Sequence, residues 1–392
     1  MTSVSRWDGV RQTLEQAVAE QVFPGAAIFI SRGDTPLAEL YVGTLEEGGA
    51  AVSDLTVYDL SSLTKPLATL SLMLVLAARG ELTLDERFVS IYPEFADRGP
   101  PAERGQRESI TLADLLAHRA GLQAVAALWQ RLQDECPDQV GTTRAAATMA
   151  GYAAELPLEY TPRTRAVYSD LGFIMLGAAL ERRLGRSFGD LVNAEVIAPL
   201  GAEVGYRSIS GSAAVPDEAL VAPCGSCSWR DGVVRGVVQD ENAWAMGGVA
   251  GHAGLFGNLR GVQALVAEYV AASKGQGRLL DRDSVLRCWQ PEHDPVGTSR
   301  NSSASTWVRG WDTPTPGASS AGRLVSPDSV GHLGFTGTSV WIDRVRGVHV
   351  ILLTNRLHPD RDNIAIRTWR PRIHDAAFLA IDAELTNATV ST

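Results

Sequence analysis

A serine and a lysine stand three residues apart in the segment Ser62-Leu63-Thr64-Lys65, just before a long apolar stretch. Residues i and i+3 share one face of a helix, so this spacing places the Lys65 amine beside the Ser62 hydroxyl. A serine hydroxyl is a useful nucleophile only with an adjacent base. A lysine supplies that base when burial or a neighbouring cation favours its neutral form. The pair therefore predicts nucleophilic catalysis at Ser62, and a helix cap at Ser62 is the non-catalytic alternative.

Two further segments carry groups that such chemistry needs. Tyr168-Ser169-Asp170 precedes an expected apolar helix, and a phenol can relay a proton when a nearby cation lowers its pKa. The alternative there is a core tyrosine followed by a helix-capping Asp170. The glycine-rich segment His332-Leu333-Gly334-Phe335 precedes an expected strand. Glycine beside a strand allows a ligand to approach the backbone closely.

The strands that would position these groups lie near both ends of the chain. Runs of strand-forming residues occur at 26–31 and 37–42, and again at 338–343 and 348–354, where they read as an antiparallel hairpin. Helical patterns fill the chain from Lys65 to about residue 201, and a closing helix is expected at 364–385. This order predicts an α+β fold: one antiparallel sheet built from both chain termini and flanked by helices, with an inserted, mainly helical domain.

We assign residues 1–65 and 325–392 to the sheet domain and residues 66–324 to the mainly helical inserted region. The inserted region carries the Tyr168 motif. Near its end, residues 289–325 are rich in Pro, Gly, Ser and Thr, which predicts a long loop of the kind that is more often functional than structural.

Composition and charge exclude several classes of protein. The chain has 392 residues, 45% hydrophobic and 20% charged, which is typical of a globular protein. A net charge of -10 argues against a nucleic-acid partner, which needs a basic surface. We expect no membrane partner, because no segment reaches the roughly 20 apolar residues of a membrane span. Residues 1–22 lack the apolar core of a secretory signal, so we expect a cytoplasmic location. The chain has no His-Glu-x-x-His motif, and its glycine-rich segment 247–254 does not follow a clear strand with dinucleotide-binding spacing, so we expect neither metal nor organic cofactor.

Taken together and in this order, the Ser62, Tyr168 and His332 segments resemble the motifs of the serine β-lactamase and penicillin-binding protein superfamily. The likeness is greatest to its class C branch, with that branch's esterase and D-aminopeptidase-like relatives. It runs over nearly the whole chain and includes residues 115–122 and 247–256. The resemblance implies a β-lactamase/transpeptidase-like fold and a covalent acyl-enzyme.

The same resemblance implies a role for each candidate residue. Ser62 is the acylated nucleophile, Lys65 helps to deprotonate it, and Tyr168 shuttles protons to the leaving group and activates water. The backbone N–H groups of Ser62 and Phe335 form an oxyanion hole, in which one donor stabilises the transition state by about 2.7–4 kcal/mol. The remaining positions, Asp170, His332 and Gly334, are expected to bind substrate.

Two of those positions depart from the class C pattern. Asp170 replaces an asparagine that donates an amide N–H to substrate, whereas an ionised aspartate only accepts. It would repel an anionic substrate, or form an ion pair with Lys65. His332 and Leu333 replace Lys-Thr, and a histidine is largely neutral at pH 7, whereas a lysine is a cation that suits a carboxylate. Both changes favour esters or neutral amides over penicillins.

We therefore expect a serine hydrolase that cleaves a small-molecule ester or amide through acyl-Ser62, above all a carboxylesterase of short-chain esters. Weak β-lactamase activity, or D-amino-acid amidase or peptidase activity, would accompany it. Two alternatives remain open. One is an acyltransferase that uses the same acyl-Ser62, and the other is a non-catalytic, penicillin-type ligand-binding or sensor domain. The sequence leaves the oligomeric state undetermined.

Overall fold

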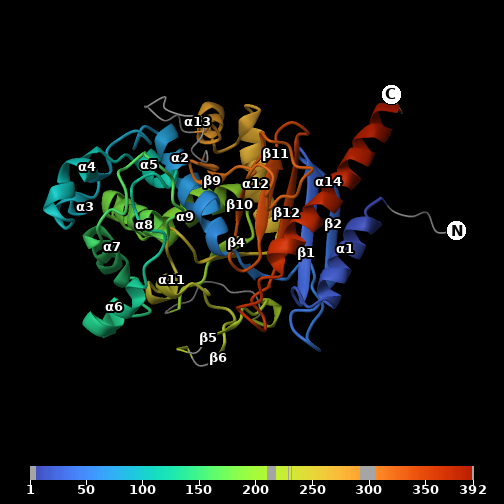
Figure 1. Cartoon of the computed structure of the whole chain (residues 1–392), viewed down its shortest axis with the longest axis horizontal. Coiled ribbons are helices and arrows are strands. Elements are labelled where there is room, and N and C mark those ends of the chain that lie inside the picture. Colours follow the sequence, from blue (N-terminus) through green and yellow to red (C-terminus); the bar gives the residue numbers. More distant parts are fainter. Residues whose placement is uncertain (1–5, 210–217, 228, 231, 292–304, 391–392) are drawn as a thin grey trace.

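The computed structural model describes residues 6–209, 218–227, 229–230, 232–291 and 305–390 (Figure 1). A sheet that brings both ends of the chain side by side lies on the right in Figure 1, next to a large group of helices on the left. Helices α1 (Asp8–Ala19) and α14 (Ile366–Val390) pack against each other at the outer side of the sheet.

The main sheet has seven strands in the order β2-β1-β12-β11-β10-β9-β8, and the neighbouring strands are antiparallel. Strand β1 pairs with β12 along its length, which joins the two ends of the chain. The α+β fold with one antiparallel sheet built from both termini is thus confirmed. The strands are β1 (Gly25–Arg32), β2 (Thr35–Gly43), β8 (Trp307–Val308), β9 (Trp311–Asp312), β10 (Val330–Leu333), β11 (Ser339–Asp343) and β12 (Val348–Thr354).

Three of these strands were not predicted from the sequence: β8, β9 and β10, the last of which lies in the segment that we expected to precede a strand. Strands β8 and β9 lie inside the segment 289–325, where we expected a long loop. Strands of two residues are too short to give an alternating pattern, so the sequence did not reveal them. Residues 292–304 of that segment lie outside the described residues. The domain boundaries stay a prediction, and the sheet extends into the range 66–324 through these two strands.

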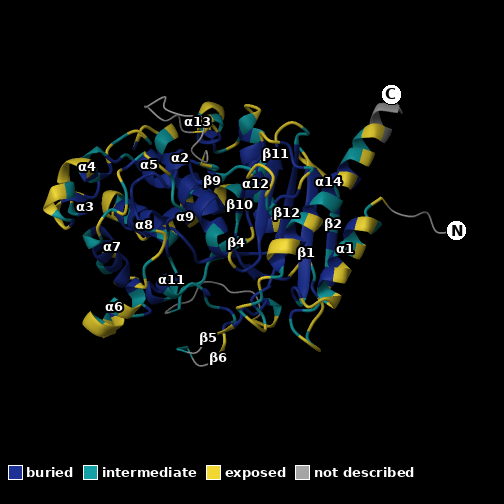
Figure 2. Ribbon diagram, viewed as in Figure 1, coloured by how far each residue is buried: buried dark blue, intermediate teal, exposed yellow. Residues whose placement is uncertain are grey.

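Helices cover both faces of the main sheet. Because successive side chains of a strand alternate between faces, Ile28 and Ile30 of β1 pack into the core beneath α1 and α14. Ala27 and Phe29 face the other side, where they join the core that contains helix α12 (Leu259–Ser273). The central strands are therefore buried on both sides, as the dark blue interior of Figure 2 shows.

The middle of the chain is mainly helical, as expected. A three-stranded sheet, β3 (Tyr58–Asp59), β7 (Leu255–Gly257) and β4 (Val204–Tyr206), lies beside the helices, and β5 (Ser226–Cys227) pairs with β6 (Gly232–Val233). The remaining α-helices are α2 (Ser71–Ala78), α3 (Glu94–Asp97), α4 (Arg104–Ser109), α5 (Leu112–Leu116), α6 (Leu128–Glu135), α7 (Ala145–Glu155), α8 (Asp170–Leu184), α9 (Phe188–Val192), α10 (Ala198–Leu200), α11 (Glu241–Ala245) and α13 (Arg282–Cys288).

A buried helical segment passes through the centre of the molecule and carries the Ser-x-x-Lys motif. It begins with a 3₁₀ turn at Ser61–Leu63, continues as a π-helical stretch at Lys65–Leu70 and ends as α2. Among the described residues, Ser61–Ala78 is the one helical run long and apolar enough to cross a membrane, and 83% of it is buried inside the protein. Burial of this extent is typical of a core helix that is apolar on all sides.

Candidate active site

Ser62 lies in the turn between strand β3 and the central helix, half-buried and held by its neighbours. The Asp59 carboxyl anchors this turn, because Oδ1 accepts the Ser61 N–H (2.8 Å) and Oδ2 accepts the Gln239 N–H (2.7 Å). Ser61 has a φ of 49°, which residues other than glycine rarely adopt. The backbone next to the nucleophile is therefore kept in a strained conformation by surrounding hydrogen bonds.

Lys65 is completely buried, and its amine reaches three oxygen atoms. Nζ donates to Ser62 Oγ (3.0 Å) and to the backbone carbonyl of His252 (3.0 Å). It also lies 2.7 Å from Asp170 Oδ1, with which it forms an ion pair. The i, i+3 spacing thus places the amine beside the hydroxyl, as predicted from the sequence.

Tyr168 completes the contacts to the nucleophile. Its hydroxyl donates to Ser62 Oγ at 2.7 Å across 106 residues of sequence. The Tyr168 ring packs between His118 and Trp307, with ring centroids 4.7 and 4.9 Å away. Aromatic packing on two sides fixes the direction of the phenol, so the structure brings together all three predicted catalytic residues.

The site keeps both neighbours of Ser62 protonated before substrate binds. Burial opposes the charge on Lys65, but Asp170 and Tyr168 together outweigh burial and raise the pKa of Lys65 above its ordinary value. Burial also raises the pKa of Tyr168 to about 12, although Lys65 acts in the opposite direction. We expected a base in which burial favours the neutral amine, whereas here Asp170 reverses that effect. Lys65 must therefore lose a proton before it can accept one from Ser62.

Asp170 opens helix α8 with its side chain directed at Lys65. The Asp170 side chain is only 18% exposed, and the ion pair occupies one of its oxygens. Of the two outcomes expected for this residue, repulsion of an anionic substrate or pairing with Lys65, the structure contains the pairing. Its role in substrate binding stays a prediction.

His332 lies on strand β10 behind the tyrosine, and only 1% of it is exposed. Its ring is 6.0 Å from that of Tyr168 and 5.7 Å from that of Trp307, and Nδ1 lies 2.9 Å from the carbonyl oxygen of Leu333. Burial, assisted by the charge of Lys65, lowers the pKa of His332 to about 3. His332 occupies the position of the lysine in β-lactamases, and its imidazole is neutral, as we expected from the sequence.

Gly334 and Phe335 bring the edge of the sheet against the nucleophile turn. A Cβ at Gly334 would lie 2.0 Å from Thr338 Oγ1 and 2.8 Å from the carbonyl oxygen of Leu60, so only glycine fits. The Phe335 N–H, the predicted oxyanion donor, donates to Ser61 Oγ at 3.1 Å. One of the two predicted oxyanion donors is thus already hydrogen-bonded to the side chain of Ser61, the residue before the nucleophile. The sequence analysis did not single out Ser61 for this role.

Several neighbours of the three groups were not predicted as site residues, although one of them, His252, lies in the family-like segment 247–256. His252 contributes its carbonyl oxygen to Lys65 from 187 residues away, and its Nε2 lies 2.8 Å from Asp240 Oδ1. No spacing rule reveals such a contact. His118 falls within the family-like segment 115–122, which was a usable signal, whereas Trp307 carried none.

Two arginines approach the Phe335 ring, which is 47% exposed. The guanidinium carbons of Arg356 and Arg361 lie 4.5 and 5.4 Å from the ring centroid. Arg356 Nε donates to the Phe335 carbonyl (2.8 Å), and Arg361 forms an ion pair with Glu241. Two guanidinium groups therefore lie near the oxyanion donor, and that of Arg361 is paired with Glu241.

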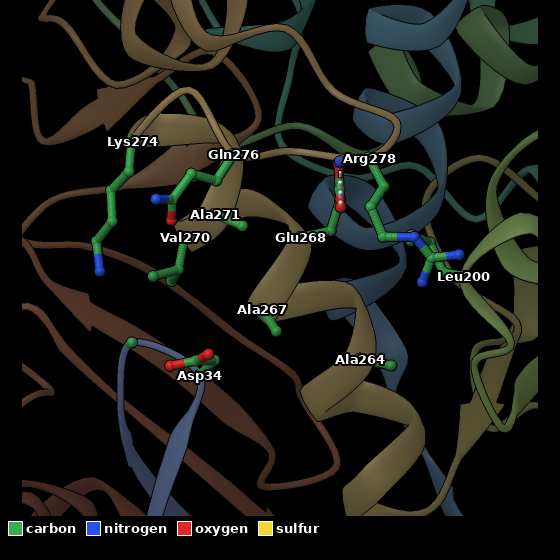
Figure 3. Close-up of a pocket in the computed structure, with 11 residues that line it drawn as sticks. Asp34, Leu200, Ala264, Ala267, Glu268, Val270, Ala271, Lys274, Gln276 and Arg278 are labelled. Carbon is green, nitrogen blue, oxygen red and sulfur yellow. Dashed lines mark hydrogen bonds between the residues drawn. The ribbon is translucent and has the colours of Figure 1, made fainter.

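A separate pocket of about 420 Å³ lies between the β1–β2 turn, helix α12 and the loop after it, and is lined by Asp34, Glu268, Lys274 and Arg278, among others (Figure 3). Its buried Glu268 accepts three successive backbone N–H groups of residues 278–280, at 2.7–3.1 Å. That carboxylate closes the loop on the helix, so it serves the fold.

The fold and the Ser62–Lys65–Tyr168 arrangement define the class of β-lactamase and penicillin-binding-protein-like serine hydrolases. The family model described as Beta-lactamase matches residues 10–371, and the chain belongs to this family.

Its relatives have several different names. The chain is 28% identical, over 77% of its length and 70% of the relative, to a protein of Escherichia coli (strain K12) named "Putative D-alanyl-D-alanine carboxypeptidase". It is 28% identical, over 89% of its length and 80% of the relative, to the "N-acetylmuramyl-L-alanine amidase" of Bacillus subtilis (strain 168). The solved structure of "EstCE1, a hydrolase with promiscuous acyltransferase activity" has the same fold, with a TM-score of 0.72, 22% identity and coverage of 95% of this chain and 98% of that one.

Proposed function

We propose that this protein is a serine hydrolase that forms an acyl-enzyme on Ser62 and that its preferred substrates are short-chain carboxylic esters. The observation that carries the proposal is the joint approach of Lys65 (3.0 Å) and Tyr168 (2.7 Å) to Ser62 Oγ. Once Lys65 has lost a proton, these groups can accept the proton of the hydroxyl and return it to a leaving group. A binding or sensor domain has no need of all three.

The proposed reaction uses these contacts in the following order. Ser62 Oγ attacks the ester carbonyl while its proton passes to Lys65, which must first be neutral. The backbone N–H groups of Ser62 and Phe335 stabilise the resulting oxyanion. Tyr168 then gives its proton to the departing alkoxide and regains one from Lys65. Water repeats these steps in reverse on the acyl-enzyme.

The preference for esters rests on His332. A penicillin or a D-alanyl peptide carries a carboxylate that a cation recognises well. His332 is neutral and almost completely buried, so it adds no such attraction. A small, uncharged ester has no carboxylate, so its binding does not depend on a cation at this position.

Two other activities have specific support. Acyl transfer to an alcohol uses the same acyl-Ser62, and the structural relative EstCE1 is described as a hydrolase with promiscuous acyltransferase activity. Cleavage of D-amino-acid peptides is favoured by the charges of Arg356 and Arg361 beside Phe335, and the E. coli relative is named for a D-alanyl-D-alanine carboxypeptidase.

One set of assays separates these activities. We would compare kcat/KM for p-nitrophenyl esters of increasing chain length, for nitrocefin and for a D-Ala-D-Ala peptide, using Ser62→Ala as the inactive control. The products would be analysed with and without an added acceptor alcohol. Short esters should give the highest kcat/KM, and Ser62→Ala should abolish turnover. A higher value for the peptide or nitrocefin would overturn the ester preference, and turnover by Ser62→Ala would overturn the acyl-enzyme.

A further inference from the structure

In the described part of the chain, no group accepts a hydrogen bond from the Ser62 hydroxyl. Ser62 Oγ already receives hydrogen bonds from Tyr168 and from the Lys65 ammonium. Both donors are protonated before substrate binds, since the pKa of each lies above its ordinary value. Acylation therefore requires that Lys65 or Tyr168 lose a proton before or during the attack.

One group in contact with Lys65 can accept a proton from it. Asp170 Oδ1 lies 2.7 Å from Lys65 Nζ, within the range of a proton transfer. The other two oxygens that the amine reaches, the Ser62 hydroxyl and the His252 carbonyl, are much weaker bases than a carboxylate. An asparagine at position 170, as in class C β-lactamases, has no basic oxygen for this purpose.

We propose that Asp170 takes up a proton from Lys65 when substrate covers the site, and so converts Lys65 into the base that deprotonates Ser62. The inference deepens the proposed function and rests on it. Asp170 acts through Lys65 and needs no contact with the substrate.

Binding of a substrate over Ser62 supplies the driving force for proton transfer from Lys65 to Asp170. The Asp170 side chain is 18% exposed, whereas Lys65 is fully buried. A substrate over Ser62 removes the remaining water from the carboxylate. Removing water destabilises an ion pair relative to the neutral amine and carboxylic acid, because charges lose more solvation than neutral groups do. The proton shift is thus coupled to occupancy of the site.

The protons balance through one acylation. An N–H bond of Lys65 breaks and an O–H bond forms on Asp170. The Ser62 O–H bond then breaks, its proton moves to Lys65, and Oγ bonds to the carbonyl carbon. When the ester C–O bond breaks, the alkoxide takes the Tyr168 proton, Tyr168 takes one from Lys65, and Lys65 regains the proton held by Asp170. The net change is transfer of the serine proton to the leaving alcohol.

Other ionisable groups lie close to the Lys65–Asp170 pair, and their charges influence proton transfer between the two. Neutral imidazoles lie on two sides, because burial lowers the pKa of both His118 and His332. The Asp240 carboxyl faces Lys65 from the start of α11, paired with His252. Burial opposes its charge, but His252 outweighs burial and lowers the pKa of Asp240 to about 2, so its charge is constant over the neutral range.

The test is the pH dependence of kcat/KM for p-nitrophenyl butyrate in wild type, Asp170→Asn and Asp170→Glu. The control Asp138→Asn makes the same chemical change at a surface residue that is 70% exposed and pairs with Arg144. In wild type the internal transfer should keep kcat/KM nearly level from about pH 6 to pH 8. In Asp170→Asn, Lys65 must release its proton to solvent. Loss of the carboxylate also lowers the pKa of Lys65 from its raised value, so we expect kcat/KM to follow the ionisation of Lys65 and to rise with pH, by up to about tenfold per pH unit below that pKa.

Asp170→Glu retains a carboxylate and should restore a level profile, at a lower rate, while Asp138→Asn should match wild type. Thermal unfolding of each variant would confirm that it folds. The inference is overturned if Asp170→Asn keeps the wild-type profile shape, at any rate, because a purely structural role changes the rate without adding an ionisation. A wild type that fails to acylate Ser62 would instead overturn the proposed function itself.

Discussion

Replacing Ser61 with alanine tests how the oxyanion site is held before substrate binds. The Ser61 hydroxyl accepts the Phe335 N–H at 3.1 Å, the donor that we expect the oxyanion to use. A substrate carbonyl must therefore displace this hydroxyl before it gains the donor. Ser61→Ala removes the competing acceptor and leaves both backbone donors in place. It also retains a Cβ, so the strain that accompanies the φ of 49° is unchanged.

The size of the effect follows from the kind of bond that is lost. A neutral hydrogen bond contributes a net of about 1 kcal/mol, and each 1.36 kcal/mol changes a rate constant about tenfold. We therefore expect kcat/KM to rise about fivefold in Ser61→Ala. Loss of an oxyanion donor would do the opposite and lower kcat by about 10²–10³, so the sign of the change identifies the role of the hydroxyl.

The assay is kcat/KM for p-nitrophenyl butyrate, with Tm measured on the same samples. Ser90→Ala serves as the matched control, because Ser90 is exposed and its hydroxyl donates to the nearby Arg87 carbonyl. A Ser61→Ala variant that keeps its Tm but shows an unchanged or lower kcat/KM would refute the idea that the hydroxyl covers the oxyanion donor.

Three further predictions concern the neighbours of Ser62. Tyr168→Phe keeps the ring packing but loses the 2.7 Å hydrogen bond, so kcat should fall about 10²-fold or more with little change in Tm; near wild-type kcat would remove Tyr168 from the mechanism. Burial raises the pKa of Asp59 to about 6 from an ordinary 3.8, so the folded state holds this proton more tightly than the unfolded chain. Its contribution to stability is therefore complete below about pH 4 and is lost by about pH 6, roughly 3 kcal/mol from the two-unit shift. Tm of wild type should fall more over that range than Tm of Asp59→Asn, and parallel curves would contradict this reasoning. Arg361→Ala should raise KM for a D-Ala-D-Ala peptide but not for p-nitrophenyl butyrate, and equal effects on both substrates would argue against a charge-recognising rim.

Local chemistry could be predicted from the sequence where a short-range rule applies. Ser62 and Lys65 are three residues apart, and the helical period alone places them together. The long strands have clear patterns of β-branched and apolar residues, so β1, β2, β11 and β12 were predicted within about two residues. Strands β8 and β9, with two residues each, have no pattern to detect.

Distances across the fold could not be predicted in this way. Tyr168 lies 106 residues from Ser62 along the chain, so no short-range rule places the two together. Its catalytic role was predicted from the family resemblance. The choice between repulsion and pairing at Asp170 depends on a 2.7 Å separation that no sequence pattern encodes. The covering of the Phe335 N–H by Ser61 likewise depends on where a side chain points after two distant segments meet.

The central claim is that Ser62 becomes covalently acylated, and trapping that intermediate tests it most directly. Wild type mixed with p-nitrophenyl butyrate and quenched rapidly in acid should gain the mass of one butyryl group, and peptide mapping should place it on Ser62. The account predicts this adduct in wild type, its loss in Ser62→Ala, and an initial burst of p-nitrophenol that matches the enzyme concentration if deacylation is slow. Turnover of the ester with the acyl group on another residue would contradict the account.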